Sequence, residues 1–481
     1  MKAANEMFTK PAPAVKPGDL AVVVGAGVSG VAAAKLLHKL GARVRLLDRS
    51  LDRIPADFAE WAESAGVEIV CGEHSPSQFR DAKLVVPSPG VAAAVISKFL
   101  PDGTPPEIMA ETELAWRQLS GEPVLGVTGT SGKTTTTSLC AAMLKEQGLT
   151  VFTGGNIGTP LSEYILSGEK ADVVVLELSS FQLQTCSTLH PRVGILLNIS
   201  ENHLDFHKDM EDYCDAKGKL FGICDTGCVN ADDPWTPRLI KNATCRLMCY
   251  STKSAADLTA EHIALHSDGV EFDAVSGGER AHVRLGIPGA FTVYNALGVI
   301  QAAQALGLPL EKIAAALSTA QGVKGRAEVV PTPGKDYTVL IDYSHTPDSL
   351  ENILKTVRGF CRGHVIAVFG CGGDRDPFKR PIMGGIAARL ADVAVVTSDN
   401  PRTEDPNEII RQIVAGMDGA KTPPTVIENR PKAIEWAMDH AEPGDVIVLC
   451  GKGHETYQEI GHEKRHLDER EVVASYLERT L

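Results

Sequence analysis

The chain has 481 residues, of which 43% are hydrophobic and 22% charged, and its net charge is −14. This length is too great for one core, so we expect about three globular domains. The negative charge disfavours nucleic acid or an anionic membrane as partner, and no apolar run is long enough to span a bilayer. Residues 1–18 read as a flexible polar tail without the apolar segment of a signal peptide. We therefore expect a cytoplasmic protein, and a monomer.

The first predicted domain, residues 19–121, opens with a strand, a helix and a second strand. The strand LAVVV runs into the turn GAGVSG, a helical segment follows, and ARVRLLD ends at Asp48. Gly25, Gly27 and Gly30 in that turn are typical of a Rossmann-like unit, in which a diphosphate approaches the helix N-terminus. A nicotinamide-dependent oxidoreductase is one interpretation, although the glycine pattern alone is weak evidence. Another strand is predicted in DAKLVVPSPGV, residues 81–91.

The second predicted domain, residues 122–324, carries a phosphate loop. The stretch TGTSGKTTTT at residues 128–137 follows an apolar strand and precedes a helix. Backbone N–H groups of such loops bind phosphate oxygens, Lys133 would reach the β- and γ-phosphates, and Thr134 would face Mg²⁺. The first glycine of the general pattern is replaced by Val127. A nucleotide switch protein, or a threonine-rich helix start, would also fit this loop alone.

Apolar runs continue through the second domain. Residues 171–180 and 192–200 read as buried strands, and the Ala-rich segments 295–307 and 311–320 read as helices. Such alternation predicts a parallel sheet covered on both faces, an architecture like that of phosphate-loop ATPases.

The third predicted domain, residues 325–481, is a second Rossmann-like α/β unit. Its strands are predicted in YTVLIDY, HVIAVFG, ADVAVVTSDN and DVIVLCG, with polar loops at their carboxyl ends, where ligands bind in open α/β sheets. The stretch TSDNPRTEDP at residues 397–406 is one such loop. A solvated Asx-Pro turn is the plain alternative for it.

Four of the eleven cysteines form two C-x₃-C pairs, Cys224 with Cys228 and Cys245 with Cys249. Zinc ligands can have this spacing. Small buried apolar residues in a reduced protein can have it as well, and the sequence leaves both interpretations open.

The phosphate loop also resembles a particular family. TGTSGKTTT at residues 128–136 is similar to the TGT-x-GKTT loop of the ATP-dependent Mur ligases, which build the peptide of bacterial cell-wall precursors, and the resemblance covers nearly the whole chain after the tail. It implies a UDP-binding first domain, an ATP-binding second domain and an amino-acid-binding third domain. It also implies that a substrate carboxylate takes the γ-phosphoryl group to give an acyl phosphate, which an amino group then attacks. A closure of the third domain is expected to keep the acyl phosphate from water.

The resemblance assigns roles in the centre of the chain. Lys133, Glu177, His203 and Lys217 would be catalytic; alone, the last three also read as a strand-end acid, a loop histidine and a surface lysine. Two Mg²⁺ ions would be held by Thr134, Glu177, His203 and Lys217, the last as a carbamate formed with CO₂. The implied ATP contacts are Gly129, Thr130, Ser131, Gly132, Lys133, Thr134, Thr135, Asn295, Arg326, Asp342 and His345.

The two ends of the chain resemble different members of the family. The Gly-rich turn, GGNIGTPL at 154–161 and ELSSFQLQ at 177–184 resemble the glutamate-adding ligases. They imply UDP-sugar contacts at Val28, Ser29, Arg49, Gly90 and Asn156. By contrast, DYSHTPDSL, SDNPRTED and GKGHETYQ resemble the diaminopimelate-adding ligases. They imply amino-acid contacts at Arg375, Asn400, Arg402, Gly451 and Glu455.

The chemistry of the two amino acids helps to choose between glutamate and diaminopimelate as the substrate. Arg402 could bind the distal carboxylate of either glutamate or diaminopimelate. Glu455 could accept from the distal ammonium of diaminopimelate, but with glutamate it would need another partner, such as water or a neighbouring cation. Because the front of the chain selects the UDP-sugar, we expect UDP-N-acetylmuramoyl-L-alanine and D-glutamate as substrates. Diaminopimelate addition to the next intermediate is the alternative, and L-glutamate is a third possibility.

Overall fold

The computed structural model describes residues 12–101, 105–204, 206–320, 322–420 and 422–480. Residues 1–11 of the predicted tail lie outside this range. The chain divides into two compact units. Unit 1 comprises Met1–Thr259, Val275–Glu279 and Asn295–Ala316, and unit 2 comprises Ala260–Ala274, Arg280–Tyr294 and Leu317–Leu481.

Unit 1 begins with a five-stranded parallel sheet in the order β3-β2-β1-β4-β5. Its strands are β1 (Leu20–Val24), β2 (Arg43–Asp48), β3 (Glu68–Cys71), β4 (Ala82–Pro87) and β5 (Glu107–Ile108), and its helices are α1 (Val28–Lys39), α2 (Ala56–Ala65), α3 (Ala93–Ser97) and α4 (Glu111–Trp116). All five residues of β1 are buried, and the small side chains of Ala32, Ala33 and Ala34 let α1 pack closely on the sheet. The predicted Rossmann-like unit is confirmed.

The central sheet has nine strands in the order β14-β13-β12-β11-β10-β9-β6-β8-β7. Strands β6 (Val124–Thr128), β7 (Val151–Gly155), β8 (Val173–Glu177), β9 (Val193–Leu196), β10 (Thr226–Asn230) and β11 (Arg246–Ser251) are parallel. The accompanying helices are α5 (Lys133–Glu146), α6 (Leu161–Ser167), α7 (Ser180–Gln184), α8 (Met210–Gly218), α9 (Leu220–Ile223), α10 (Thr236–Leu239), α11 (Ala290–Ala305) and α12 (Leu310–Thr319). The predicted parallel sheet of an ATPase-like domain is thus confirmed.

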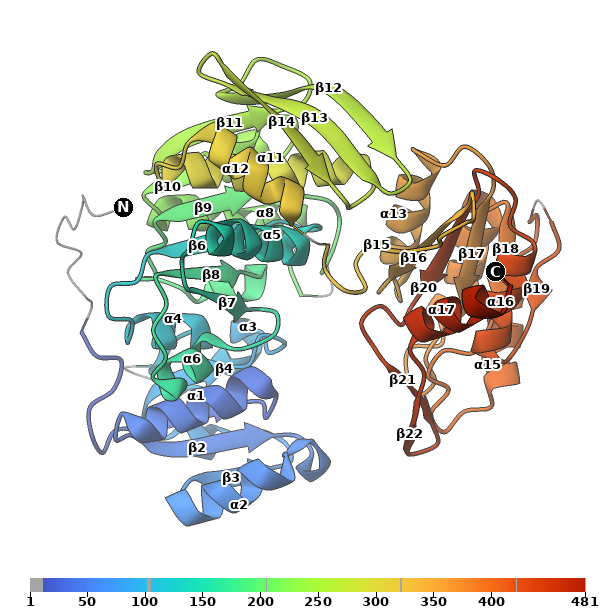
Figure 1. Cartoon of the computed structure of the whole chain (residues 1–481). Coiled ribbons are helices and arrows are strands. Elements are labelled where there is room, and N and C mark those ends of the chain that lie inside the picture. Colours follow the sequence, from blue (N-terminus) through green and yellow to red (C-terminus); the bar gives the residue numbers. More distant parts are fainter. Residues whose placement is uncertain (1–11, 102–104, 205, 321, 421, 481) are drawn as a thin grey trace. The chain divides into compact units, whose positions relative to one another are not determined.

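Three further strands extend this sheet beyond β11, and the sequence analysis did not predict them (Figure 1). They are β12 (Leu258–His266), β13 (Gly269–Ser276) and β14 (Glu279–Leu285), and the boundary between the two units runs through them. Their mixed charged and apolar residues, most of which are partly or fully exposed, lack the continuous apolar runs that marked the other strands.

Unit 2 contains a six-stranded sheet in the order β15-β16-β20-β17-β18-β19. Its strands are β15 (Glu328–Val330), β16 (Thr338–Asp342), β17 (Val365–Phe369), β18 (Val393–Val396), β19 (Thr425–Val426) and β20 (Val446–Cys450), and only the β15–β16 pair is antiparallel. A hairpin of β21 (Tyr457–Ile460) and β22 (Glu463–His466) follows.

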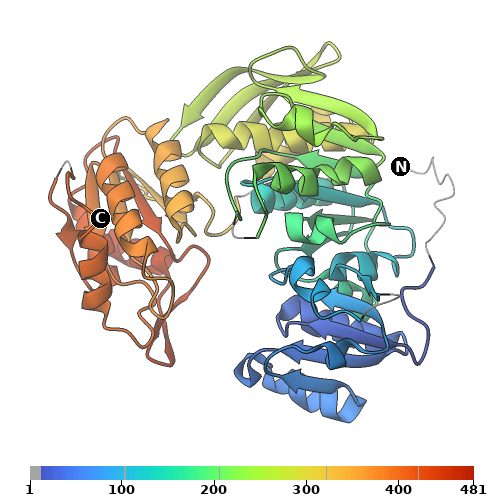
Figure 2. The same cartoon turned by 180° about the vertical axis from the view of Figure 1, so that it is seen from behind.

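Helices cover both faces of this sheet (Figures 1 and 2). Helices α13 (Pro347–Arg358), α14 (Lys379–Leu390) and α15 (Pro406–Val414) contribute to one apolar core, and α16 (Arg430–Asp439) and α17 (Glu469–Thr480) to the other. Along β16, Leu340 belongs to the first core, whereas Val339 and Ile341 belong to the second. This alternation of side chains between two helix layers confirms the predicted third α/β domain. Among the described residues, no helix combines the length and apolarity that crossing a membrane requires.

Candidate functional site

The Gly-rich turn after β1 is held closed by groups from neighbouring strands. The Asp48 carboxylate accepts a hydrogen bond from the Ala26 amide at 2.8 Å, and the Ser88 hydroxyl donates to the Gly25 carbonyl at 3.0 Å. A Cβ atom on Gly30 would lie 1.9 Å from that same carbonyl oxygen, so only glycine lets α1 approach β1 this closely. Asp48 therefore has a structural role in the turn itself.

The predicted UDP-sugar contacts in the first domain lie at the carboxyl ends of β1, β2 and β4. Val28 opens α1 with 70% of its surface exposed, Ser29 is half-buried, and Arg49 and Gly90 are exposed. Strand β1 lies between β2 and β4, so these four residues surround the point where the sheet order reverses. Open α/β sheets bind ligands at such a point.

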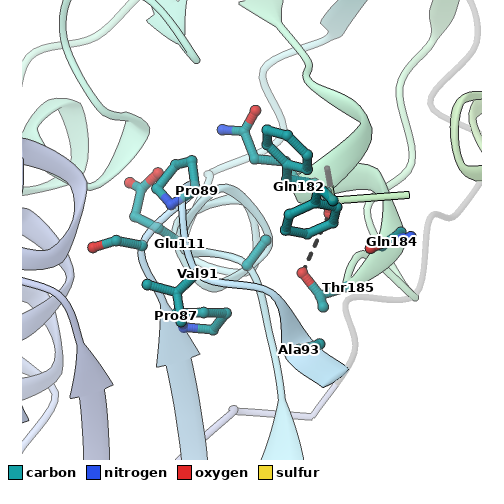
Figure 3. Close-up of a pocket in the computed structure, with 12 residues that line it drawn as sticks. Pro87, Pro89, Val91, Ala93, Glu111, Gln182, Gln184 and Thr185 are labelled. Carbon is teal, nitrogen blue, oxygen red and sulfur yellow. Dashed lines mark hydrogen bonds between the residues drawn. The ribbon is translucent and has the colours of Figure 1, made fainter. Parts of the chain in front are cut away.

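A small pocket lies beside the loop that follows β4 (Figure 3). Pro87, Pro89 and Val91 line one side of it, and Gln182 and Thr185 line the other. Glu111 also lines the pocket, and burial raises the pKa of its carboxyl group, which accepts a hydrogen bond from the Ser162 amide at 2.6 Å. The pocket adjoins the loop that carries Gly90. It therefore lies between the predicted UDP-sugar contacts of the first domain and α7 of the central domain.

The phosphate loop runs from the end of β6 to the start of α5. Asn198 fixes it from the end of β9, because its side-chain oxygen accepts from the Ser131 amide at 2.9 Å and its amide donates to the Ser131 carbonyl at 3.0 Å. The Thr130 hydroxyl also lies 3.0 Å from the Tyr213 hydroxyl. The loop is therefore braced by groups that local spacing did not reveal, and its backbone amides at the start of a 14-residue helix can meet phosphate.

Two lysines meet at this loop. The Lys133 amine donates to the carbonyls of Gly129 at 3.0 Å and Thr130 at 2.8 Å, and the Lys217 amine donates to the same Gly129 carbonyl at 2.9 Å. Lys217 is only 2% exposed and lies over the Tyr213 ring. Burial first, and the nearby Lys133 charge second, hold the pKa of Lys217 well below its usual range. Lys217 is thus not the surface lysine that one reading of the sequence allowed.

Oxygen ligands meet at the end of β8. The Glu177 carboxylate accepts from the Thr134 hydroxyl at 2.9 Å through one oxygen and from the Asn156 amide at 2.9 Å through the other. Glu177 is buried, with 2% exposure. Carboxylate and hydroxyl oxygens are ligand types that Mg²⁺ prefers, so Glu177 at the end of β8 and Thr134 at the start of α5 fit that ion.

The segment after β9 carries two histidines with different environments. His203 is exposed, has a left-handed backbone with φ of 56°, and stacks edge-on against Phe181 at 5.0 Å. Positive φ is costly for a non-glycine residue and concentrates at functional sites. His207, which the sequence analysis missed, is buried and bonds Ser180 at 2.9 Å and Asp212 at 3.1 Å. His207 therefore ties α7 to α8, and His203 is left facing outward.

Asn295 lies against the phosphate loop. A Cβ atom on Gly132 would be 2.5 Å from the Asn295 side-chain oxygen, and the Asn295 amide nitrogen is buried without a hydrogen-bond partner in the described structure. A buried donor without a partner costs about 1–3 kcal/mol, which a ligand acceptor at this position would offset.

The remaining predicted ATP contacts belong to unit 2 and gather at the carboxyl end of β16. The Asp342 carboxylate accepts from the Ala327 amide at 2.8 Å and from the Ser344 hydroxyl, and burial raises its pKa. The Arg326 guanidinium lies 5.3 Å from the centre of the Tyr343 ring, and the exposed His345 ring lies 4.6 Å from it. Arg326, Asp342 and His345 thus form one local group.

Three of the predicted amino-acid contacts, Asn400, Arg402 and Glu455, belong to one hydrogen-bond network in unit 2. The Asn400 amide donates to the Glu455 carboxylate at 2.9 Å. The Lys452 amine, which is fully buried, donates to Asn400 and to Glu455, both at 2.8 Å. Arg402 reaches the Glu459 carboxylate through Nε at 2.9 Å and the Gly373 carbonyl through Nη1 at 2.8 Å. The sequence analysis missed Lys452, although its spacing of three residues from Glu455 suits an ion pair.

Further buried charges support this network. The Asp399 carboxylate packs against the backbone of Gly451. A Cβ atom placed on Gly451 would lie 2.3 Å from a carboxylate oxygen of Asp399. The fully buried Arg430 lies 4.0 Å from Asp399 and bonds Glu469 at 2.8 Å. Arg375 is exposed, and its Cγ lies 3.8 Å from a Cβ placed on Gly372. The stretch TSDNPRTEDP is therefore not a freely solvated turn, because Thr397, Ser398, Asp399 and Asn400 are all buried.

The cysteine quartet does not form a metal site in the part of the chain that the structure describes. No group of three or more His, Cys, Asp or Glu residues there could hold a metal ion. Cys224 and Cys228 are buried and Cys245 and Cys249 are half-buried, all as free thiols. The alternative of small residues in a reduced core fits this finding.

Comparison with known proteins connects these features. Three family models match: "Mur ligase MurD-like, N-terminal domain" over residues 19–98, "Mur ligase middle domain" over 127–303, and "Mur ligase, glutamate ligase domain" over 325–453. A UDP-N-acetylmuramoylalanine–D-glutamate ligase of Nitratidesulfovibrio vulgaris is 65% identical over 219 residues, which are 46% of this chain and 49% of that protein. The chain thus spans about half the length of this relative.

Other relatives match over more of the chain. A UDP-N-acetylmuramoyl-L-alanyl-D-glutamate–2,6-diaminopimelate ligase of Clostridium acetobutylicum is 42% identical over 380 residues, covering 74% of this chain and 78% of that protein. A solved structure of a ligase with the same activity in its title is 28% identical, with a TM-score of 0.60 and 92% coverage of both chains. The fold is shared with the UDP-N-acetylmuramate–alanine ligase of Thermotoga maritima, at 22% identity and a TM-score of 0.57 over 96% of this chain and 98% of that one. The chain belongs to the Mur ligase family.

Proposed function

We propose that this protein is an ATP-dependent amide ligase of peptidoglycan precursor synthesis that joins D-glutamate to UDP-N-acetylmuramoyl-L-alanine and releases ADP and phosphate. The L-alanyl carboxylate takes the γ-phosphoryl group of ATP, and the amino group of D-glutamate attacks the resulting acyl phosphate. The observation that carries the choice of amino acid is the pairing of Glu455 with Lys452 at 2.8 Å.

Lys133 and the loop residues 129–135 would hold the phosphates, with the Asn295 amide offered to the nucleotide. The loop is already braced through Asn198 and Tyr213, so little ordering is required when phosphate binds. Arg326, Asp342 and His345 would add contacts to ATP. Their local group around Tyr343 presents a guanidinium and an exposed imidazole, both suited to an anionic ligand.

Thr134, Glu177 and His203 are the residues we assign to Mg²⁺, with two ions expected. Bound Mg²⁺ would neutralise charge on the phosphates and on the transferring group. The structure supports the assignment of Glu177 and Thr134 through their mutual hydrogen bond at the phosphate loop. The outward-facing, left-handed His203 is a candidate ligand from the segment after β9, whose carboxyl end lies at the same edge of the parallel sheet as that of β8.

Lys217 would act as a carbamate. CO₂ adds to an uncharged amine, and this amine is buried beside the Lys133 cation, a position that disfavours a second positive charge and favours an anion. Carbamate formation would replace the hydrogen bond that the Lys217 amine donates to the Gly129 carbonyl. It would also add anionic oxygen ligands near Glu177.

The UDP-sugar would bind along the carboxyl end of the first sheet. Val28, Ser29, Arg49 and Gly90 would contact the uridine diphosphate, and Asn156, held by Glu177, would meet the muramoyl end. The family model named for the D-glutamate-adding branch matches residues 19–98, which include the first four of these residues. The pocket in Figure 3 offers apolar contact next to Gly90.

The amino-acid site fits a diacid with one ammonium. Arg402 donates to protein groups through Nε and Nη1, and its remaining guanidinium nitrogen is the group we assign to the distal carboxylate. Lys452 supplies the cation that Glu455 needs, so the second ammonium of diaminopimelate is not required to neutralise it. Asn400 and Gly451 line the same network, and Arg375 would approach from its rim.

Diaminopimelate addition to UDP-N-acetylmuramoyl-L-alanyl-D-glutamate is the second candidate. One observation favours it: several relatives that are 39–42% identical over about three quarters of this chain carry that activity in their names. L-Glutamate addition is a third candidate, which the same diacid site would accommodate.

Replacing Lys452 tests the role of the cation. In Lys452→Met, we expect kcat/KM for D-glutamate to fall roughly 30-fold, or by about 2 kcal/mol, because Glu455 is left charged without its partner in a buried network. The fall should arise mainly from a higher KM for the amino acid, measured by phosphate release at saturating ATP. If diaminopimelate is accepted at all, its relative turnover should rise, since its ammonium can replace the lost cation.

Lys464→Met is the matched control. Lys464 lies over the same Tyr457 ring as Lys452, at 4.4 Å rather than 5.3 Å, but its amine is on the exposed strand β22. Unchanged kinetics in the control are expected. A normal KM for D-glutamate in a correctly folded Lys452→Met enzyme would refute the role given to Lys452.

A further inference from the structure

Two thiols of the cysteine quartet meet beside the central sheet. Cys224 directly follows α9, and Cys245 directly precedes β11. Although they belong to different C-x₃-C pairs, each thiol lies against one of two paired glycines of the sheet, and each is the largest influence on the pKa of the other. Both pack with the apolar cluster formed by α8, α9, β10 and β11.

The sheet is built to make room for both sulfur atoms. Gly194 of β9 and Gly227 of β10 are register partners. A Cβ on Gly194 would lie 3.2 Å from the Cys224 sulfur, and a Cβ on Gly227 would lie 3.1 Å from the Cys245 sulfur. Since paired residues point to the same face of a sheet, the two sulfurs lie over the same face, each against one of two neighbouring glycines. A larger residue at either position would push a sulfur out of place.

The two thiols differ in exposure and reactivity. Cys224 is 4% exposed, whereas Cys245 is half-buried between the exposed residues Thr244 and Arg246. The hydrogen bond from Cys224 lowers the pKa of Cys245 to about 7 and raises that of Cys224. The lowered pKa of Cys245 favours its thiolate, which is the reactive form of a cysteine. Burial instead raises the pKa values of Cys228 and Cys249.

We propose that Cys245 and Cys224 are a site of reversible disulfide formation with a hydroperoxide as the oxidant. The Cys245 sulfur attacks one peroxide oxygen, the O–O bond breaks, and the other oxygen leaves as hydroxide, giving a sulfenic acid. The Cys224 sulfur then attacks the Cys245 sulfur, the S–O bond breaks, and water leaves with the Cys224 proton. Two thiols are oxidised and one hydroperoxide is reduced, and a thiol reductant reverses the reaction.

The bond would tie the segment that carries Lys217 to β11. Leu220 begins α9 three residues after Lys217 and packs on two glycines of the sheet. A Cβ atom would lie 3.4 Å from the Leu220 side chain if placed on Gly126 of β6, and 2.9 Å from it if placed on Gly194 of β9. Oxidation therefore restrains the segment between α8 and β10, which directly follows Lys217. This inference does not depend on the substrate proposed above.

Thiol counting after oxidation tests the proposal. The full-length protein is treated with a small excess of hydrogen peroxide, alkylated under denaturing conditions and analysed by intact mass and peptide mapping. We expect two of the eleven cysteines to become unavailable to the alkylating agent, one linked peptide pair containing Cys224 and Cys245, and full recovery with dithiothreitol.

Two variants make the result decisive. In Cys245→Ser, peroxide should not make two thiols unavailable to the alkylating agent. Cys249→Ser alters the other cysteine of the second C-x₃-C pair, which is also half-buried, and it should still lose two thiols as the parent does. Circular dichroism verifies that both variants are folded. Retention of all eleven thiols in the parent, a disulfide between other cysteines, or an unchanged loss of two thiols in Cys245→Ser would overturn the proposal.

Discussion

Lys217→Ala is expected to reduce ligation by at least about 10²–10³-fold, the range seen when one preorganised electrostatic group is removed from an active site. Lys217 is buried against Gly129 of the phosphate loop, and alanine has no amine to form a carbamate there. The loss should appear in kcat more than in the KM for ATP, because Lys133 and the loop backbone remain to bind the phosphates.

Lys219→Ala is the matched control for this variant. Lys219 lies two residues further along, is exposed, and donates to the Gln184 carbonyl at 2.6 Å. Near-normal activity is expected for it. A short carboxylate such as formate should restore part of the activity of Lys217→Ala by supplying an anion in the vacated space. Full activity of Lys217→Ala without any additive would rule out the carbamate.

Glu177→Gln is expected to have the second largest effect, a fall in kcat of about 10²-fold. Glutamine keeps the size of the side chain and one acceptor oxygen, but it removes the negative charge that faces Thr134 at the end of β8. The concentration of Mg²⁺ needed for half-maximal activity should rise markedly. Phosphate release measured across a Mg²⁺ titration gives both quantities.

Glu169→Gln is the control for this charge, because Glu169 is exposed in the loop after α6, before the amino end of β8, whereas Glu177 lies at the carboxyl end of that strand. It should leave both kcat and the Mg²⁺ requirement unchanged. An unaltered Mg²⁺ titration in Glu177→Gln, together with a native fold, would remove Glu177 from the set of metal ligands.

The sequence predicted those parts of the molecule in which neighbouring residues carry the information. Gly25, Gly27 and Gly30 marked the first turn, in which Gly25 has a positive φ and Gly30 packs directly against Gly25, and the GKT of the phosphate loop marked the second domain. The apolar runs likewise marked the buried parallel strands.

Features that depend on distant partners were not predictable in the same way. Lys452 bonds Asn400 across many residues of sequence, and His207 bonds Ser180 from a different segment. Strands β12, β13 and β14 lack apolar runs, since much of their surface is exposed. The proposed roles of the site residues rest on the family resemblance as well as on these contacts.

The central claim, that this Mur ligase adds D-glutamate, is tested most directly by phosphate release with ATP and Mg²⁺ and two matched substrate pairs. One pair is UDP-N-acetylmuramoyl-L-alanine with D-glutamate, with L-glutamate as the control. The other is UDP-N-acetylmuramoyl-L-alanyl-D-glutamate with diaminopimelate. We predict turnover with the first pair and D-glutamate alone. Turnover with the diaminopimelate pair alone would contradict the account and show that the network of Asn400, Arg402 and Glu455 selects the longer diamino acid.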